Sequence, residues 1–495
     1  MVRALTTPAL VALAVFAAPA CGQSLEALTP QLDAGFEDYA RAQHVPGLVW
    51  GIVKDGQLAH VKGIGVQDFD SRRPVGPESR FRIASMSKAF TALTILSLRD
   101  EGRLRLDDLA ETHVPEMKGW TYPTADSPRI RVRDLLHHVG GLVEDDPWGD
   151  RQTSLPEADF SAMLAAGVPF SRVPQQSQEY SNFGYATLGR IIRNVAGKPF
   201  EAAIAERIFQ PLGMGRTGYD VFASPQAERA LGYRFEEGEY KREPDMAAGA
   251  FGAMGGIETT ASDYARYVAW LLSAWPARDD PETGPIRRAS VRGLVQGLNF
   301  VRFGQRRADL GPPCAQAVAY AMGFRMISDC EVGDYMTHTG GYPGYGSVLI
   351  MLPESGIGIF AFANRTYSAP MAPAYGAMKA LKAAGLATPR PVPLTAAVAQ
   401  AHADAAKVWA ASDILAARPN LAMNMLLDRA APEWRLELTR LKARLGECTP
   451  TDAPEPTGML TASFRWPCSR GTLAGSFMLA PTNPPTIQQL RFQAE

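Results

Sequence analysis

Two pairs of apolar segments, separated by most of the chain, constrain the fold more than any other feature of this sequence. Residues 47–53 (GLVWGIV) and 58–66 (LAHVKGIGV) flank an Asp-Gly turn, and residues 346–352 (GSVLIML) and 356–364 (GIGIFAFAN) flank a second turn. Apolar runs of this length around turn residues indicate β-hairpins. Helical patterns dominate the chain between them. The sequence therefore predicts one sheet built from both ends of this region, with a helical subdomain inserted between them.

The remaining segments divide the chain into further parts. We expect an α/β domain over residues 25–385, followed by a Pro-rich linker at 386–395 (LATPRPVPLT). Residues 396–495 are first Ala-rich and helical and then strand-like, so they predict a small α+β appendage. Residues 275–318 form a long irregular stretch, which we interpret as an insertion or lid.

The N-terminus predicts export. Residues 1–20 combine an early arginine, a short apolar run and an Ala-x-Ala end, which is the pattern of a secretory signal peptide. The apolar run is too short to span a bilayer. Cys21 follows at once and is a possible site for a lipid anchor. We expect an exported protein, either periplasmic or associated with the outer membrane or cell surface.

Cysteine usage agrees with export. The four cysteines after Cys21 allow three disulfide pairings. The local pairing joins Cys314 to Cys330 and Cys448 to Cys468, and each bridge would add roughly 3 kcal/mol by the loop-entropy model. Four reduced, buried cysteines are the alternative. No Cys-x-x-Cys motif occurs and the histidines lack metal-ligand spacing, so we expect no metal and no cofactor.

Charge limits the partners. Lys and Arg total 50 and Asp and Glu total 51, which leaves a net charge of -1. Because binding to nucleic acid requires a basic surface, we do not expect a nucleic-acid partner.

Ser85 and Lys88 are the first candidate catalytic pair. They begin the segment SMSKAFTALTILSLRDEG, which is apolar on nearly all sides and ends at Gly102, so a buried helix is expected. Residues three apart share a helix face, which brings the lysine amine to the serine hydroxyl. Burial lowers the pKa of a lysine, and its neutral amine can then activate the serine. The alternative is a helix-capping serine beside a lysine that only packs.

Tyr180 and Asn182 form the second candidate motif. They precede another apolar helix that ends in glycine, FGYATLGRIIRNVAG. A phenol can relay a proton to or from a serine hydroxyl, and an amide can hold both a lysine and a substrate amide. An ordinary loop before a helix is the alternative interpretation.

His338 and Gly341 complete the third motif, His-Thr-Gly-Gly, just before the C-terminal strand pair. The glycine pair allows close approach of a substrate backbone, and the Gly341 amide could serve as an oxyanion donor. His338 could be a proton relay, a cationic contact for a carboxylate, or simply a structural histidine.

These three motifs, in this order, resemble the serine β-lactamase and penicillin-binding protein superfamily, and most closely its class C β-lactamase and D-alanyl-D-alanine carboxypeptidase branch. The resemblance covers roughly residues 30–385. It includes the segments FRIASMSKAFTAL, EGRLRLDDL, VRDLLHHVGGL, RIFQPLGMGRT, GGIETTASDYARY and HTGGYPGYGSVLIMLPESGIGIF. It implies an antiparallel sheet flanked by helices, with the active site between the sheet and a helical subdomain.

The resemblance also implies a role for each motif residue. Ser85 would be the acylated nucleophile, Lys88 and Tyr180 the acid/base pair, and Asn182 the residue that positions the acyl side chain. The remaining two are His338, at the position of the usual Lys, and Gly341, whose amide would share the oxyanion hole with that of Ser85.

Departures from the family pattern guide the choice of substrate. His-Thr-Gly resembles the carboxypeptidase, D-peptidase and esterase members more than the lactamases, and His138-Val139-Gly140 stands where relatives often have His-Thr-Ser. We expect a small-molecule or peptide substrate, with D-amino-acid or cell-wall peptides first, β-lactams second and carboxylic esters third. A non-catalytic binding protein on the same fold is the alternative from another class, and an anchoring role of the appendage is a further one.

Overall fold

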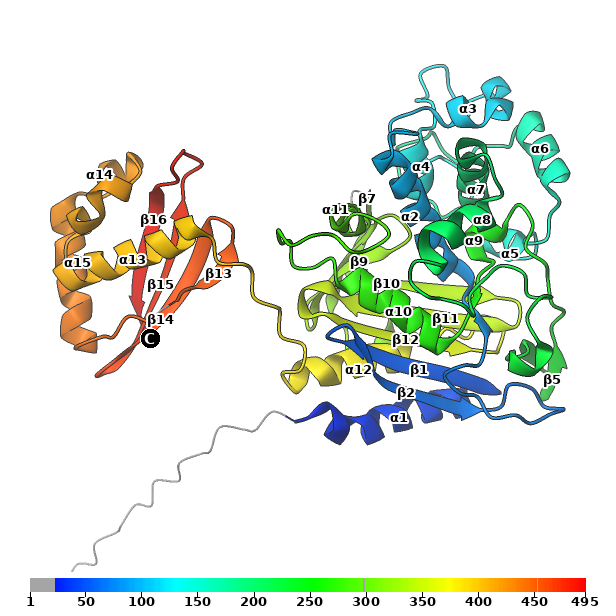
Figure 1. The fold of residues 1–495 in the computed structure, drawn as a ribbon, viewed down its shortest axis with the longest axis horizontal. Helices are drawn as coiled ribbons and strands as arrows, with labels where there is room; N and C mark the ends of the chain where they lie inside the picture. Colours follow the sequence, from blue (N-terminus) through cyan, green and yellow to red (C-terminus); the bar gives the residue numbers. More distant parts are fainter. Residues whose placement is uncertain (1–22, 297–298, 452) are drawn as a thin grey trace, which may run out of the picture.

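The computed structural model describes residues 23–296, 299–451 and 453–495. The expected signal peptide and Cys21 lie outside these residues. Figure 1 shows a large body, a connecting segment and a smaller C-terminal unit. None of the helices formed in the described ranges combines the length and the apolar character that crossing a membrane requires.

An eight-stranded antiparallel sheet forms the centre of the large body, in the order β2-β1-β12-β11-β10-β9-β8-β7. Both ends of the region contribute, because β1 pairs with β12 and places Ile52 opposite Ile359. The expectation of one sheet built from distant hairpins is therefore confirmed. Its strands are β1 (Gly47–Lys54), β2 (Gln57–Gly65), β7 (Asn299–Gln305), β8 (Ala315–Tyr320), β9 (Arg325–Asp329), β10 (Gly333–Tyr342), β11 (Tyr345–Leu352) and β12 (Ile357–Ala363).

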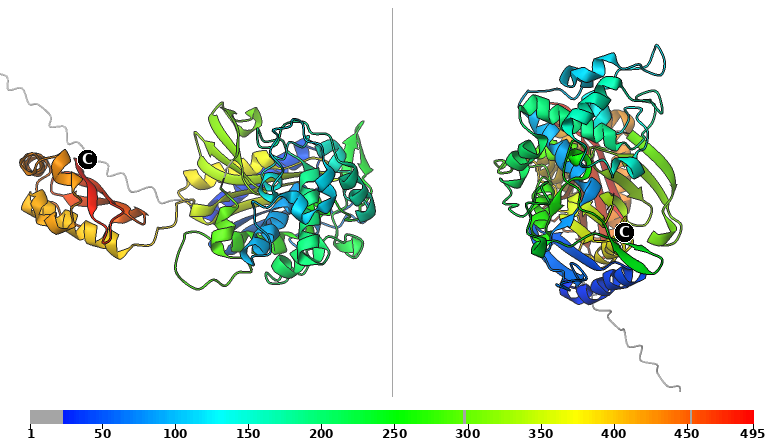
Figure 2. Two further views of the ribbon diagram at one scale, coloured as in Figure 1. Left: turned by 90° about the horizontal axis from the view of Figure 1, so that it is seen from above. Right: turned by 90° about the vertical axis from the view of Figure 1, so that its right-hand side faces the viewer.

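Helices cover both faces of this sheet (Figures 1 and 2). On one face, α1 (Leu25–Ala42) and α12 (Met371–Ala383) share an apolar cluster with the strands. On the other, α10 (Ala261–Leu272) belongs to a second cluster that continues into the helical subdomain. Because apolar helices cover both faces, β11 and β12 are buried along their whole length, which explains their continuous apolar sequence.

The helical subdomain lies in the chain between two short paired strands, β3 (Phe81–Arg82) and β6 (Glu258–Thr259). It also holds the hairpin of β4 (Tyr233–Glu236) and β5 (Glu239–Arg242). Its helices are α2 (Ser87–Asp100), α3 (Ala110–His113), α4 (Val132–Leu136), α5 (Asp146–Gly149), α6 (Glu157–Ala166), α7 (Asn182–Ala196), α8 (Phe200–Ile204) and α9 (Gly252–Gly255).

The stretch 275–318 corrects one expectation. It holds α11 (Arg288–Gly293), but its second half is not an irregular lid, because β7 and the start of β8 extend the central sheet at its edge. A disulfide joins Cys314 to Cys330, the residue after β9. Strand β7 was not expected from the sequence, because exposed positions break its apolar pattern.

The C-terminal unit has its own apolar core. Its helices are α13 (Ala396–Ala411), α14 (Asn424–Asp428) and α15 (Ala431–Leu445), and its sheet contains β13 (Glu455–Gly458), β14 (Thr461–Cys468), β15 (Gly471–Leu479) and β16 (Ile487–Ala494). A second disulfide joins Cys448 to Cys468. The two bridges are thus the local pairing, one of the three that the sequence allowed.

Candidate active site

Ser85 lies in a 3-10 turn, η1 (Ala84–Met86), that leads directly into α2. Ala84 has a φ of 49°, a left-handed conformation that costs free energy in a residue with a side chain. The turn is held from one side by Gly340, where an added Cβ would lie 2.3 Å from the Ile83 carbonyl oxygen. The nucleophile candidate therefore sits on a strained turn that close packing fixes in place.

Lys88 lies one turn further on and points back to Ser85. Its Nζ donates to Ser85 Oγ at 3.0 Å, to Asn182 Oδ1 at 2.7 Å and to the Met254 carbonyl at 2.9 Å. The lysine is fully buried. Burial lowers its pKa to about 8, while the nearby carboxylate of Asp146 opposes this shift. A lysine with this pKa exchanges its proton readily near neutral pH.

Asn182, the first residue of α7, ties the lysine to an acidic loop. Its backbone N–H donates to Asp145 Oδ1 at 2.6 Å, and its Nδ2 donates to Asp146 Oδ1 at 2.8 Å. Because its Oδ1 accepts from Lys88, the amide can be oriented in only one way. The Lys88 amine is thus held by Asn182, which is itself held by hydrogen bonds to Asp145 and Asp146.

Tyr180 lies beside this pair, with Lys88 Nζ 4.8 Å from the centre of its ring. Burial raises the pKa of the Tyr180 phenol well above its usual value. The phenol therefore carries its proton at neutral pH and can donate it. The three residues Ser85, Lys88 and Tyr180, from two separate segments, meet at one point.

His338 is buried on β10 and is uncharged. Its Nδ1 lies 2.6 Å from the Thr339 carbonyl, and its Nε2 lies 3.1 Å from the Tyr320 hydroxyl. Since a carbonyl can only accept, Nδ1 carries the hydrogen and Nε2 accepts from Tyr320. Burial, with the positive charge of Arg325 next, lowers the pKa of His338 to about 3. Of the roles expected for His338, a lowered pKa favours a neutral ring over a cationic contact.

Gly341 lies where β10 leaves an open edge. Residues 333–337 of β10 pair with β9, and residues 336–342 pair with β11. From residue 338 onward, β10 therefore has β11 as its neighbour on one side and an open edge on the other. An added Cβ on Gly341 would lie 2.7 Å from Tyr367. The open edge faces a cavity of about 230 Å³ that all three motifs border. Its lining residues are Ser85, Asp146, Asp150, Tyr180, Arg325, His338, Thr339, Gly340, Gly341, Tyr367 and Ala369.

The sequence reasoning missed the charged groups of this cavity. Arg325 begins β9 and, among the residues that the structure describes, its side chain has no hydrogen-bond or ion-pair partner. On the acidic side, Asp150 accepts from the Tyr367 hydroxyl at 3.1 Å. Burial, with the neighbouring charge of Asp146, raises the pKa of Asp150 to about 7. No motif spacing marks these residues, because three distant loops and strands supply them.

His138, at the departure from the family pattern, supports the second motif. Its Nδ1 accepts the Ser181 N–H at 3.0 Å, and its ring lies 4.3 Å from the ring of Tyr180. Burial lowers the pKa of His138 well below its usual value, so the ring is neutral and can accept. Through the bond to Ser181 and the ring contact, His138 therefore supports the position of Tyr180.

The fold and this cluster define a class of protein. A serine hydroxyl held by a buried lysine, on a mixed α/β scaffold, is an arrangement of hydrolases that use an activated serine. The chain belongs to the β-lactamase family, whose model, described as "Beta-lactamase", matches residues 32–383.

Curated relatives match part of the chain. Protein flp of Staphylococcus aureus is 33% identical over 210 residues, which cover 42% of this chain and 41% of that protein. The chain thus spans about two fifths of the length of these staphylococcal relatives. An uncharacterized protein of Mycobacterium tuberculosis is 31% identical over 262 residues, which cover 48% of this chain and 65% of the relative.

A solved structure shares the fold. The octameric penicillin-binding protein homologue from Pyrococcus abyssi matches with a TM-score of 0.59 and 20% sequence identity. The match covers 94% of this chain and 99% of that one. Because the C-terminal unit makes up a fifth of this chain, a match of this extent must include much of it. At this identity the likeness shows the fold alone.

Proposed function

We propose that the protein is an exported serine hydrolase that works through an acyl-enzyme on Ser85. The observation that carries the proposal is the contact of Lys88 Nζ with Ser85 Oγ at 3.0 Å, by a lysine whose pKa burial lowers to about 8. A lysine that only packed would not need to turn its amine toward a serine. The two disulfides are compatible with an oxidising compartment.

In the proposed mechanism Lys88, as the neutral amine, takes the proton of Ser85. The serine oxygen bonds to the substrate carbonyl carbon, and the carbonyl electron pair moves to oxygen. The backbone amides of Ser85 and Gly341 are proposed to bind this oxyanion. When the intermediate collapses, the bond between the carbonyl carbon and the leaving group breaks. The Tyr180 phenol donates its proton to the leaving group. Lys88 then returns a proton to the Tyr180 phenolate. Asn182 is proposed to position the acyl side chain, and the neutral His338, bonded to Tyr320 and the Thr339 carbonyl, is proposed to shape the wall of the cavity. Water then repeats the sequence on the acyl-enzyme and frees Ser85.

We propose peptides with a free C-terminal carboxylate, of the D-amino-acid or cell-wall type, as the first substrate class. Arg325 supports this choice, because it is an unpaired cation on the cavity wall beside an uncharged His338. A guanidinium matches a carboxylate in geometry as well as charge. β-Lactams, which also carry a carboxylate, are the second class, and carboxylic esters are the third.

The test is the intact mass of the purified protein after incubation with a penicillin, beside Ser85→Ala. A stable adduct on the wild type alone would support a penicillin-binding peptidase with slow deacylation. Hydrolysed penicillin without an adduct would identify a β-lactamase. Intact penicillin and no adduct would remove both, and D-alanyl peptides and simple esters would then be compared.

A non-catalytic binding protein predicts a different result. Labelling by a fluorophosphonate requires an activated serine, so the wild type should be labelled and Ser85→Ala should not. A wild-type protein that is never labelled and turns over no ester, peptide or lactam would overturn the proposed hydrolase. The predicted signal peptide and the lipid anchor at Cys21 are tested separately, by the mass of the mature protein after secretion.

A further inference from the structure

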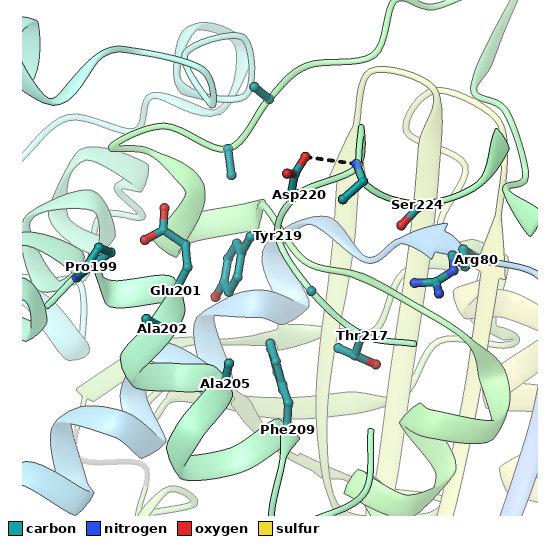
Figure 3. Close-up of a pocket in the computed structure, with 14 residues that line it drawn as sticks. Arg80, Pro199, Glu201, Ala202, Ala205, Phe209, Thr217, Tyr219, Asp220 and Ser224 are labelled. Atoms are coloured by element: carbon teal, nitrogen blue, oxygen red, sulfur yellow. Dashed lines mark hydrogen bonds between the residues drawn. The ribbon is translucent and has the colours of Figure 1, made fainter. Parts of the chain in front are cut away.

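A second cavity, of about 750 Å³, lies in the helical subdomain (Figure 3). None of its lining residues borders the cavity at Ser85. The segment of α9 lies between the two cavities: the Met254 carbonyl accepts from Lys88, whereas Phe200 packs on Gly252 and Tyr219 packs on Gly256, the residue after α9. Its volume is within the range of small-molecule sites. It lies outside the proposed catalytic machinery.

The carboxylate of Glu201 borders this cavity. Within the described residues it forms no ion pair and no hydrogen bond to another side chain, and it is half-buried at the start of α8. Burial raises the pKa of Glu201, with the charge of Glu157 adding to the shift. A carboxylate that is partly removed from water and has no ion-pair partner in contact can accept hydrogen bonds from a ligand ammonium group.

The hydroxyl of Tyr219 belongs to a second side chain that lines this cavity. It is buried and has no hydrogen-bond partner among the residues that the structure describes. Glu201 is near enough to contribute to raising the pKa of this phenol. Buried polar groups in proteins are nearly always paired, so this hydroxyl marks a place where a hydrogen-bonding ligand would satisfy an unpaired group.

Arg80 supplies the opposite charge at the far side of the cavity, as Figure 3 shows. Its Nε donates to Glu228 at 3.1 Å and its Nη1 to the Arg216 carbonyl at 2.8 Å. These bonds hold the guanidinium in place and leave its Nη2 without a protein partner among the described residues. By contrast, Asp220 uses its carboxylate on the nearby backbone amides of Phe222 and Ala223.

The lining between the two charges is mixed, because Thr217, Asp220 and Ser224 contribute polar groups. Small and aromatic side chains form the apolar part, against which a chain of small residues can lie. These residues are Pro199, Ala202, Ala205, Phe209, Ala223, Ala247 and Ala248.

We infer that this cavity is a second binding site, for a short peptide with free termini. Its ammonium group binds Glu201 and the Tyr219 hydroxyl, and its carboxylate binds Arg80. A ligand with only one charge leaves one end of the cavity unmatched, so both termini are required.

The test uses trialanine as the probe, titrated by calorimetry into the full chain carrying Ser85→Ala so that the probe is not turned over. We expect binding that weakens at least ten-fold in Glu201→Gln and in Ala202→Trp, which fills the cavity from an exposed position. Glu206→Gln is the matched control, because this exposed carboxylate lies nearby on the same segment but outside the cavity. N-acetyl-trialanine and trialanine amide should each bind at least ten-fold more weakly.

Absence of binding by trialanine at millimolar concentration would overturn the inference. Binding that is equally strong in Ala202→Trp and Glu201→Gln would place the peptide elsewhere, and the inference would fail. If a variant does not fold, the capped peptides provide the test, because capped peptides that bind as tightly as trialanine would contradict the inference. None of these outcomes depends on acylation of Ser85, so the proposed hydrolase stands or falls separately.

Discussion

Gly340 of β10 and Ile83 before the nucleophile turn are in direct backbone contact. A Cβ built on Gly340 would lie 2.3 Å from the Ile83 carbonyl oxygen and 3.0 Å from the Ala84 Cβ. The Ser347 side chain bonds the same Ile83 carbonyl at 2.8 Å. The open edge of β10 and the turn at Ser85 therefore pack closely, because residue 340 is a glycine and has no Cβ between them.

Gly340→Ala should separate these two elements. Because a misplacement of about 1 Å can cost 10²-fold in rate, we expect kcat/KM to fall by about 10²-fold or more. Overpacking of this kind should also cost about 1–3 kcal/mol of unfolding free energy. The control is Gly376→Ala in α12, where an added Cβ meets nothing within 4 Å. Equal activity of the two variants would contradict the assignment of this contact.

The pH dependence of kcat/KM should report Lys88. Its pKa is lowered to about 8, and the neutral amine is the form that accepts a proton, so kcat/KM should rise with pH through about pH 8. The carboxylate of Asp146 favours the charged lysine. Asp146→Asn should therefore lower this pKa further and move the rise to lower pH, and Asp150→Asn should do so to a smaller extent.

Asp159→Asn on α6 provides the control for these profiles. Its carboxylate is exposed and lies outside the cavity, so the profile should not move. A rise that keeps its position in all three aspartate variants would mean that Lys88 is not the titrating base.

His138 should act as a positioning residue for Tyr180. His138→Phe removes the acceptor for the Ser181 N–H, and we expect kcat to fall about ten-fold or more with little change in KM. His138 has a φ of 57°, a conformation that asparagine tolerates. His138→Asn keeps an acceptor there and should restore part of kcat. A purely structural role would instead lower the stability of both variants and leave their kcat alike.

Arg325→Gln should discriminate between substrates. If Arg325 binds a carboxylate, the variant loses a charge-assisted hydrogen bond worth about 1.5–3 kcal/mol, or roughly 10- to 10²-fold in kcat/KM. This loss should apply to a peptide with a free C-terminus and not to its C-terminal amide. Arg302→Gln, which removes an exposed arginine outside the cavity at Ser85, should leave both rates unchanged. The same loss on both peptides would rule out carboxylate recognition by Arg325.

Removal of the disulfide Cys314–Cys330 should destabilise the large body. Its ends are 16 residues apart, so the loop-entropy model gives roughly 3 kcal/mol. Urea unfolding of Cys314→Ser/Cys330→Ser measures this loss. The matched variant Cys448→Ser/Cys468→Ser removes the bridge of the C-terminal unit. In this variant the large body should unfold at the same urea concentration as in the wild type. An unchanged transition in the first variant would show that this bridge adds nothing.

Much of the architecture could be predicted because it rests on local patterns. The helix over Leu25–Ala42 and the hairpin of β1 and β2 follow from apolar periodicity and from an Asp55-Gly56 turn with φ of 51° and 80°. The strands β7 and β8 could not be predicted, because their places in the sheet are decided by the pairing of β8 with β9 and of β7 with β8, and not by their own composition.

The sequence by itself determined which family the chain belongs to and which motif residues are its candidates for catalysis. Ser85 and Lys88 are one helical turn apart, so their meeting is a local consequence of the helix. Only the tertiary structure decided the electrostatics around them. It brought Asp146, Asp150 and Arg325 to one cavity and buried His338 as a neutral ring. Charge and burial depend on neighbours that are distant in the chain, which no local pattern records.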